Sequence, residues 1–321
     1  MRGCVASLCV AASIVASPAR ADDFPSRPIT IVVPFNAGGP TDTVARVVAD
    51  RMARALNQSV VIENMPGAGG TIAAARVARA LPDGYTIDFA SMSTHVISPV
   101  LYPLPYDVFR DFAPVALLTK TPLLIMSRKS VPATDMKGFA AWLKTNPDSL
   151  LLGIAGATDQ MAGYLLAQQT GSRLQSVPYR GLSLALQDLI AGRIDVMFDQ
   201  PSDALPQFKS GAVKVFAVTA PTRLAVAPDI PTVDEAGLSG LHITPWYSLW
   251  VPRATPDDIR AKLAAATMEA LADPAVIKRL GDIGQEVVPR DQQNAESLAA
   301  FYKAETDKWW PIIKAAAMKA E

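Results

Sequence analysis

Cysteine is almost missing from this chain of 321 residues, which contains only Cys4 and Cys9. Both lie in an N-terminal stretch with the features of a secretory signal, an apolar run followed by the small-residue site Ala19-Arg20-Ala21. Cleavage after Ala21 would remove both thiols, which excludes disulfide bonds and a cysteine nucleophile from the exported protein. We therefore expect residues 1–21 to be a cleaved signal peptide and the mature protein to be periplasmic. A lipid anchor at Cys9 is the alternative, but the bulky Leu8 precedes it where a small residue is usual.

An excess of charge of either sign is also lacking, because 30 basic residues face 30 acidic ones. No basic field exists to attract nucleic acid or an acidic membrane surface. The N-terminal apolar run is shorter than the ~20 residues that a transmembrane helix requires. A composition of 50% hydrophobic and 19% charged residues suits one or two α/β domains. We expect a soluble monomer without a nucleic-acid partner.

Catalytic motifs are missing as well. The chain has only two histidines, and no Gly-x-Ser-x-Gly motif, phosphate loop or paired-histidine metal spacing occurs. The segment Gly67–Ile72 resembles half of a dinucleotide fingerprint, but Ile72 stands where a small residue is needed and the segment follows the second expected strand. The sequence therefore predicts no metal and no cofactor, and it favours a binding protein over an enzyme.

What the chain does contain is an alternation of strand-like and helix-like segments, which is typical of α/β folds. The apolar run Ile29–Phe35 predicts a buried strand. The periodic apolar residues between Val44 and Leu56 predict a helix that begins near Pro40. Shorter strands are expected at Val60–Ile62 and Tyr85–Ala90.

The same alternation repeats after a break, which predicts two lobes. Val115–Met126 reads as two strand pieces that cross from the first lobe to the second, and Tyr247–Val251 reads as the returning strand. Helices are then expected at Asp257–Ala272 and from about Asn294 to Lys319. The predicted first lobe is discontinuous, with residues 22–120 and 243–321, and residues 121–242 form the second.

Several motifs resemble those of the Bug, or TctC, family of receptors for tripartite tricarboxylate transporters. The first are Phe24–Phe35 (FPSRPITIVVPF), Gly38–Asp42 (GGPTD) and Glu63–Gly70 (ENMPGAGG). The resemblance then covers the rest of the chain through Pro82–Tyr85, Asp111–Val115, Val177–Tyr179, Asp195–Asp199, Pro231–Gly237 and Lys308-Trp309.

The resemblance implies a two-lobed periplasmic binding protein of type II, the Venus-flytrap fold, in which each lobe is a mostly parallel sheet flanked by helices. Such receptors enclose a small organic acid between the lobes and deliver it to membrane permease subunits. They hold one carboxylate through backbone amides and waters. The ligand could be a dicarboxylate, a tricarboxylate, an aromatic acid or an amino acid. Two alternatives stay open, a sensor that signals to a membrane kinase and an exported enzyme.

The first expected site segment follows the first strand, because ligands of such sheets bind beyond the carboxyl ends of strands. Glycines there let the backbone approach a ligand, and the helix start attracts an anion. Asp42 would repel an anionic ligand, so we expect it to cap the helix or hold a water. A plain tight turn is the alternative. The candidate residues are Phe35, Gly38, Gly39, Thr41 and Asp42.

The second segment is the hydroxyl-rich loop after the third strand, with candidates Ser91, Ser93 and Thr94. His95 follows, and a lone histidine is more often a structural hydrogen-bonding residue than a ligand contact. The resemblance implies Asn at the position of Ser98.

The third segment is Gly156–Gln160, with candidates Ala157, Thr158 and Asp159. Relatives usually have a neutral hydroxyl where Asp159 stands. This carboxylate either caps the following helix or accepts a hydrogen bond from a ligand amine or hydroxyl. Tyr179 and Asp199, which end the next two strands, complete the candidates, and packing or turn formation is their alternative role.

Overall fold

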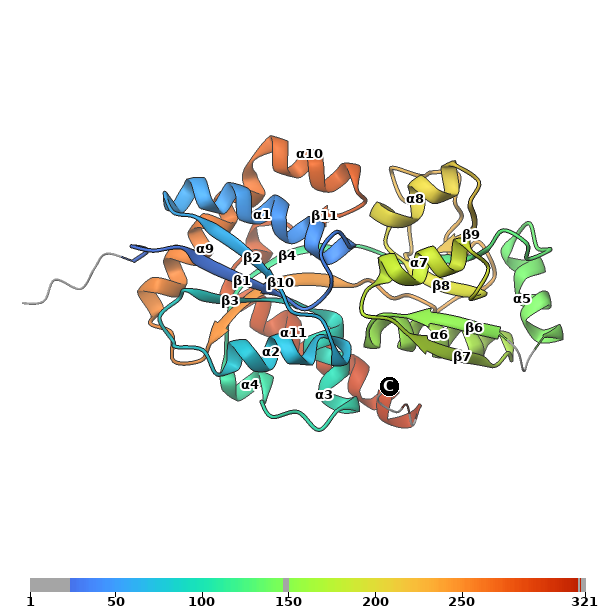
Figure 1. The fold of residues 1–321 in the computed structure, drawn as a ribbon, viewed down its shortest axis with the longest axis horizontal. Coiled ribbons are helices and arrows are strands. Elements are labelled where there is room, and N and C mark those ends of the chain that lie inside the picture. Colours follow the sequence, from blue (N-terminus) through green and yellow to red (C-terminus); the bar gives the residue numbers. More distant parts are fainter. Residues whose placement is uncertain (1–23, 147–149, 317, 319–321) are drawn as a thin grey trace, which may run out of the picture.

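A computed structural model describes residues 24–146, 150–316 and 318. The expected signal peptide at 1–21 lies outside these residues. The described chain forms two α/β lobes side by side, each built on one sheet (Figure 1). No helix in the described ranges is long and apolar enough to cross a membrane.

The first lobe is built on six strands in the order β11-β4-β10-β3-β1-β2. Strands β1 and β2 run parallel, as do β1 and β3, while β10 runs antiparallel to both β3 and β4, and β11 is antiparallel to β4. The buried apolar residues Ile29, Ile31, Val32 and Val33 make β1 a central strand, as its sequence predicts. The strands are β1 (Ile29–Val33), β2 (Val60–Asn64), β3 (Thr86–Ser91), β4 (Phe112–Lys120), β10 (Trp246–Pro252) and β11 (Glu286–Val287).

Helices cover both faces of this sheet, with α1, α9 and α10 on one face and α2 and α11 on the other (Figure 1). Pro40 is the first residue of α1, a position where the backbone N–H has no partner within the helix, so proline is tolerated there. Val44, Val48 and Met52 form the buried face of the helix. The C-cap residue Asn57, which follows the last helical residue, has a left-handed backbone conformation that ends the helix. The helices are α1 (Pro40–Leu56), α2 (Thr71–Ala78), α3 (Ser98–Leu101), α4 (Val108–Asp111), α9 (Asp257–Ala272), α10 (Pro274–Asp282) and α11 (Ala295–Ala315).

The second lobe has a five-stranded sheet in the order β7-β6-β8-β5-β9. Here β6 is parallel to β7 and β8, whereas β5 is antiparallel to β8 and β9. Its strands are β5 (Leu124–Arg128), β6 (Leu150–Ile154), β7 (Leu174–Pro178), β8 (Val196–Asp199) and β9 (Val213–Val218). Its helices are α5 (Met136–Thr145), α6 (Ala157–Thr170), α7 (Leu182–Ile190) and α8 (Pro201–Lys209).

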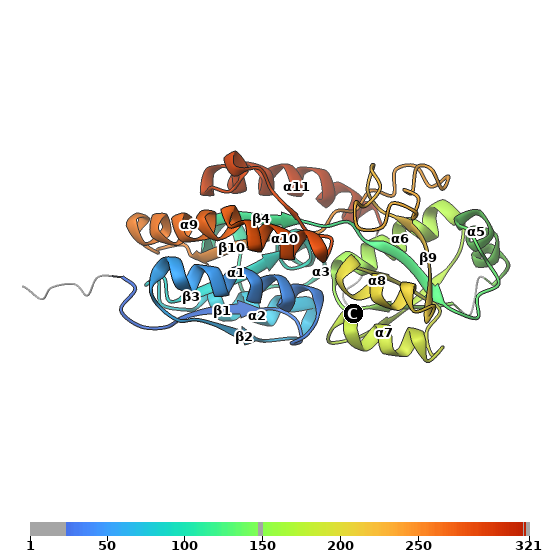
Figure 2. The ribbon, with the colours of Figure 1, turned by 90° about the horizontal axis from the view of Figure 1, so that it is seen from above.

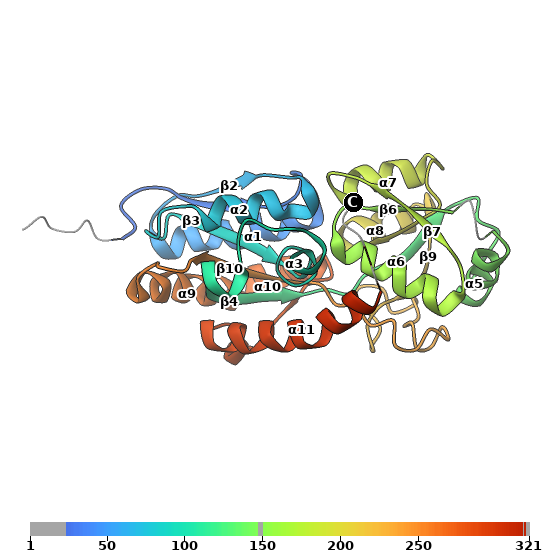
Figure 3. The same ribbon diagram turned by 90° about the horizontal axis from the view of Figure 1, so that it is seen from below.

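The chain passes between the lobes twice, as Figures 2 and 3 show from opposite sides. It leaves the first sheet at the end of β4 and enters the second at β5, and it returns through the segment between β9 and β10. The two-lobed α/β fold is confirmed. The sheets are mixed rather than mostly parallel, because the strands that connect the lobes run antiparallel to their neighbours.

The C-terminal part confirms both predicted helices, since Asn294 is the N-cap of α11, and it adds elements that the sequence analysis did not predict. The observed bounds of α9 are those predicted, Asp257–Ala272. Asp273 then accepts a hydrogen bond from the Ala275 N–H, which caps a separate helix, α10. The short strand β11 follows and extends the first sheet beside β4.

Candidate functional site

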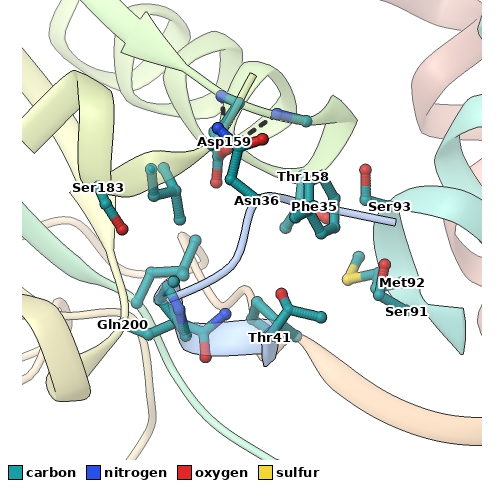
Figure 4. Close-up of a pocket in the computed structure, with 18 of the residues that line it drawn as sticks. Phe35, Asn36, Thr41, Ser91, Met92, Ser93, Thr158, Asp159, Ser183 and Gln200 are labelled. Atoms are coloured by element: carbon teal, nitrogen blue, oxygen red, sulfur yellow. Dashed lines mark hydrogen bonds between the residues drawn. The ribbon is translucent and has the colours of Figure 1, made fainter. Parts of the chain in front are cut away.

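A pocket lies between the lobes at the carboxyl ends of their strands, and both lobes supply its walls (Figure 4). Its volume is about 50 Å³. One water needs ~10–15 Å³ by the same measure, so the pocket has room for a small molecule. We call it the inner pocket.

Four helices begin at the inner pocket, and the N-cap residue of each lines it: Gly39 of α1, Gly156 of α6, Gly181 of α7 and Gln200 of α8. At α1, α7 and α8 the N-cap side chain accepts no hydrogen bond from the helix. Helix N-termini present N–H groups and partial positive charge. Their convergence makes the inner pocket suited to an anion.

The segment from Phe35 to Asp42, a loop that continues into the first turn of α1, supplies the first wall. Gly38 has a φ of 80°, a left-handed conformation that favours glycine. Gly39 faces the second lobe, where a Cβ would lie 3.5 Å from the Ser183 Oγ, at van der Waals distance. The Thr41 hydroxyl lies 3.1 Å from the Tyr247 hydroxyl, which is also in the pocket wall.

Asp42 does not line the inner pocket but holds the loop in shape. Its carboxylate accepts hydrogen bonds from the Gly38 N–H at 2.9 Å, from the Arg46 Nε at 2.8 Å and from the Asn64 Nδ2 at 2.9 Å. Burial raises the pKa of Asp42, but these hydrogen bonds outweigh burial and hold it below its usual value. Asp42 is therefore a charged residue whose acceptor capacity is used within the protein.

The end of β3 and the helical turn that follows it, Ser93–Ile97, supply the second wall through Ser91 and Ser93, so the segment predicted as a loop is helical. Thr94 is buried behind them, and its Oγ1 accepts a hydrogen bond from the Ser91 N–H at 3.1 Å. The Ser93 Oγ reaches across the interface and accepts the N–H of Ala157, the first residue of α6, at 2.9 Å. One hydroxyl thus ties the first lobe to a helix start in the second.

His95 lies in the same helical turn and does not line the inner pocket. It is fully buried, with its ring 5.3 Å from that of Phe112 and 5.2 Å from that of Trp250 between centroids. Its Nε2 lies 3.3 Å from Oδ2 of the buried Asp88. Burial lowers the pKa of His95 to about 3 and raises that of Asp88 to about 8. Neutral forms are therefore favoured, and His95 is a structural residue of the first lobe.

Asp159 lines the inner pocket from the second lobe and is 5% exposed. Its Oδ2 accepts the N–H groups of Ala155 and Gly156 at 3.0 and 3.1 Å, so it caps the start of α6. Burial raises the pKa of Asp159 to about 7, although these two hydrogen bonds act to lower it. Asp159 is thus a carboxyl group in the pocket wall that titrates near neutral pH.

The sequence-predicted residues divide into three groups. Seven line the inner pocket: Phe35, Gly39, Thr41, Ser91, Ser93, Thr158 and Asp159. Ala157 and Tyr179 line a neighbouring pocket, which also contains Phe35. Gly38, Asp42, Thr94 and Asp199 line neither. Asp199 is fully buried, and its Oδ1 accepts the Gln200 N–H at 2.8 Å.

Sequence reasoning missed a hydrogen-bonded chain that joins the lobes. The Gln200 side chain, from the second lobe, donates to the Tyr247 hydroxyl and accepts from the Gln285 Nε2 at 2.9 Å. Thr119 in turn donates to Gln285 at 2.8 Å. Gln200 could have been found because it follows a strand end directly, whereas nothing in the sequence around Tyr247 or Gln285 marks them.

Ser183 is a further missed residue of the pocket wall, two positions after Gly181. A glycine and a hydroxyl after the strand end at Tyr179 are the sequence signal that points to it. Among the described residues, no group of three or more His, Cys, Asp or Glu side chains is arranged to hold a metal ion.

The chain matches the family model described as tripartite tricarboxylate transporter family receptor over residues 44–318. MatC from Rhodopseudomonas palustris, solved with bound malate, is 42% identical with a TM-score of 0.87, covering 90% of this chain and all of MatC. The periplasmic binding protein BugD is 37% identical with a TM-score of 0.88, covering 93% of this chain and all of BugD.

A third solved structure, an R. palustris protein with adipate, is 31% identical with a TM-score of 0.87 and covers 92% of this chain and 99% of its own. These proteins share the two-lobed fold seen here, and the family match spans most of the described residues. The chain therefore belongs to the Bug, or TctC, family of periplasmic solute-binding receptors of the tripartite tricarboxylate transporters.

Proposed function

We propose that this protein binds a small organic carboxylate in the inner pocket and delivers it to the membrane permease of a tripartite tricarboxylate transporter. The observation that carries the proposal is the convergence of four helix N-termini on one pocket between the lobes. Three of these helices lack a side-chain cap, which leaves their N–H groups for a ligand oxygen. The malate and adipate of the two relatives are carboxylates of the expected class.

The site residues of this proposal are backbone and hydroxyl donors. N–H groups at the starts of α1, α7 and α8 bind one carboxylate of the ligand, and the hydroxyls of Thr41, Ser91 and Ser183 orient the remainder. In the part of the chain that the structure describes, no lysine or arginine lines the inner pocket. Selectivity for a carboxylate then depends on oriented dipoles, which act more strongly between protein lobes than in bulk water.

Closure of the lobes completes the site. We propose hinges at 120–121 and 242–243, which divide the chain into residues 22–120 with 243–321 and residues 121–242. The bonds from Ser93 to Ala157 and from Gln200 to Tyr247 both join one proposed lobe to the other. A ligand contacted by both lobes stabilises this closed arrangement over an open one.

A thermal-shift screen of the mature chain against small carboxylic acids tests the binding step, with calorimetry of each acid that stabilises it. A ligand at 100 times its Kd adds ~2.7 kcal/mol to stability. Thr158→Glu adds a carboxylate to the pocket wall and should abolish binding. Thr145→Glu, at the exposed end of α5, is the matched control and should bind as the wild type does. If no carboxylate stabilises the wild type, the proposal fails.

Delivery to a permease is tested in cells. A strain that lacks the gene should stop growing on the identified acid at low concentration and recover when the gene is restored. A receptor that only reports the acid to a membrane kinase would instead leave uptake of the labelled acid intact once the transporter is expressed from an independent promoter.

A further inference from the structure

A second pocket of about 310 Å³ lies beside the inner pocket, and we call it the outer pocket. Both pockets share Phe35, Ala155 and Gly156 in their linings. The outer pocket also draws on both lobes, with the Gly67–Gly70 loop on one side and the loop after β7 on the other. It is therefore adjacent to the inner pocket and is assembled from the same two lobes.

Phe35 forms the partition between the two pockets. A Cβ on Gly156 would lie 3.4 Å from the Phe35 ring, and a Cβ on Gly70 would lie 3.6 Å from it. The ring thus packs between two glycine backbones, one from each lobe. A ligand that extends from the inner to the outer pocket would run along this ring, which suits an aliphatic chain.

The two pockets differ in charge. Among the residues that the structure describes, Asp159 is the one ionisable acid or base in the lining of the inner pocket apart from Tyr247, whereas the lining of the outer pocket contains Arg180 and no Asp or Glu. Within the described ranges no carboxylate pairs with Arg180. The nearby Asp188 is occupied, since it accepts from the Tyr179 hydroxyl at 2.8 Å and from Arg193 at 2.7 Å.

The position of Arg180 is set by the sheet. It is the second residue after β7, and the N–H of the intervening Tyr179 donates to the carbonyl of Ile154 at 2.7 Å, beside the start of α6. The next residue, Gly181, is the N-cap of α7 in the inner pocket. The backbone thus places a guanidinium at the outer pocket one residue away from a donor of the inner pocket.

We propose that Arg180 and the outer pocket form a second anion subsite, which binds the distal carboxylate of an elongated dicarboxylic acid. The inference rests on the proposed function, because the first carboxylate occupies the inner pocket. A dicarboxylate confined to the inner pocket meets the Asp159 carboxyl, whereas one that reaches past Phe35 meets the unpaired guanidinium of Arg180. The receptor therefore favours longer dicarboxylates over short ones.

Calorimetry with succinate, adipate and pimelate tests this subsite, using the wild type, Arg180→Gln, Arg180→Lys and Lys209→Gln. Lys209→Gln is the control for net charge, since it removes a cation from the exposed last turn of α8. Arg180→Gln should weaken adipate and pimelate about tenfold, the lower end for a charge-assisted bond. It should change succinate less than twofold. Arg180→Lys should recover part of the loss, and Lys209→Gln should change nothing.

Each other outcome overturns the subsite. Equal weakening of all three acids would make Arg180 a general electrostatic or structural residue. Unchanged affinities together with lost uptake in cells would assign Arg180 to the permease contact. A wild type that binds succinate but neither longer acid would refute the subsite and leave the proposed function standing, whereas binding of no carboxylate would refute both.

Discussion

Asp159→Asn is the substitution that most directly tests the electrostatics of the pocket. The wild-type carboxyl is 5% exposed, and its Oδ2 accepts two backbone N–H groups at the start of α6. Asparagine has nearly the same shape and keeps an oxygen that can accept both hydrogen bonds. The substitution therefore removes the charge and leaves the cap in place.

The size of the effect follows from the pKa of Asp159, which burial raises from 3.8 to about 7. A folded-state pKa above the unfolded one means that the folded protein binds the proton more tightly. The protonated Asp159 carboxyl therefore contributes its full stabilisation below about pH 4, and this contribution is lost as the pH rises to about 7. Since one pH unit corresponds to ~1.4 kcal/mol, the loss is at most about 4 kcal/mol.

We expect Asp159→Asn to be the more stable protein at pH 8 by roughly 1–3 kcal/mol, after allowance of ~1 kcal/mol for a weaker cap. At pH 5 the wild type should be as stable as the variant or slightly more stable. Thermal unfolding without ligand at four pH values between 5 and 8 measures both. If the two melting-temperature profiles run parallel over this range, the carboxyl is ionised throughout and the electrostatic argument is wrong.

The same variant decides between the two roles of Asp159 toward ligand. Succinate has no hydrogen-bond donor, whereas aspartate carries an amine and malate a hydroxyl. If Asp159 accepts from that donor, Asp159→Asn at pH 8 should weaken aspartate by ~1.5–3 kcal/mol and strengthen succinate by relief of repulsion. Parallel affinity changes for the two ligands would show that Asp159 acts only as a helix cap.

Three further predictions concern closure, the buried pair and export. Gln200→Ala removes the hydrogen bonds to Tyr247 and Gln285. Small-angle scattering at saturating ligand should then show a larger radius of gyration than for the wild type. An unchanged radius would show that these bonds do not hold the lobes closed. Burial raises the pKa of Asp88 to about 8, so wild-type stability should fall as the pH rises from about 4 to 8. Asp88→Asn should therefore flatten the dependence of stability on pH. A melting-temperature difference between variant and wild type that stays constant over that range would contradict this. Mass spectrometry of the periplasmic protein should find Asp22 as the first residue and no acyl chain, whereas an acylated species beginning at Cys9 would contradict the cleavage site.

Much of the fold was readable from local sequence. The apolar spacing in α1, with Pro40 at its start, and the residues of α9 are short-range signals that depend on helical periodicity and on N-terminal preferences. The position of the site segments after strands followed from the parallel part of each sheet. Seven of the predicted residues line the inner pocket for this reason.

Only the tertiary structure decided which residues of each loop face the pocket. Gly38 and Asp42 lie in the same short segment as Gly39 and Thr41, but the hydrogen bonds that the Asp42 carboxylate accepts from Arg46 and Asn64 turn it away. Asp199 is buried, while its neighbour Gln200 reaches the pocket. Adjacent residues point in different directions, and packing rather than residue type selects between them.

The same holds for partners that are distant in the chain. Gln200 and Tyr247 meet across 47 residues, and Ser93 and Ala157 across 64. Helix and strand patterns are set by neighbours within a few positions, so a single sequence reveals them. Contacts between lobes depend on how two sheets sit against each other, and this geometry leaves no periodic pattern in the chain.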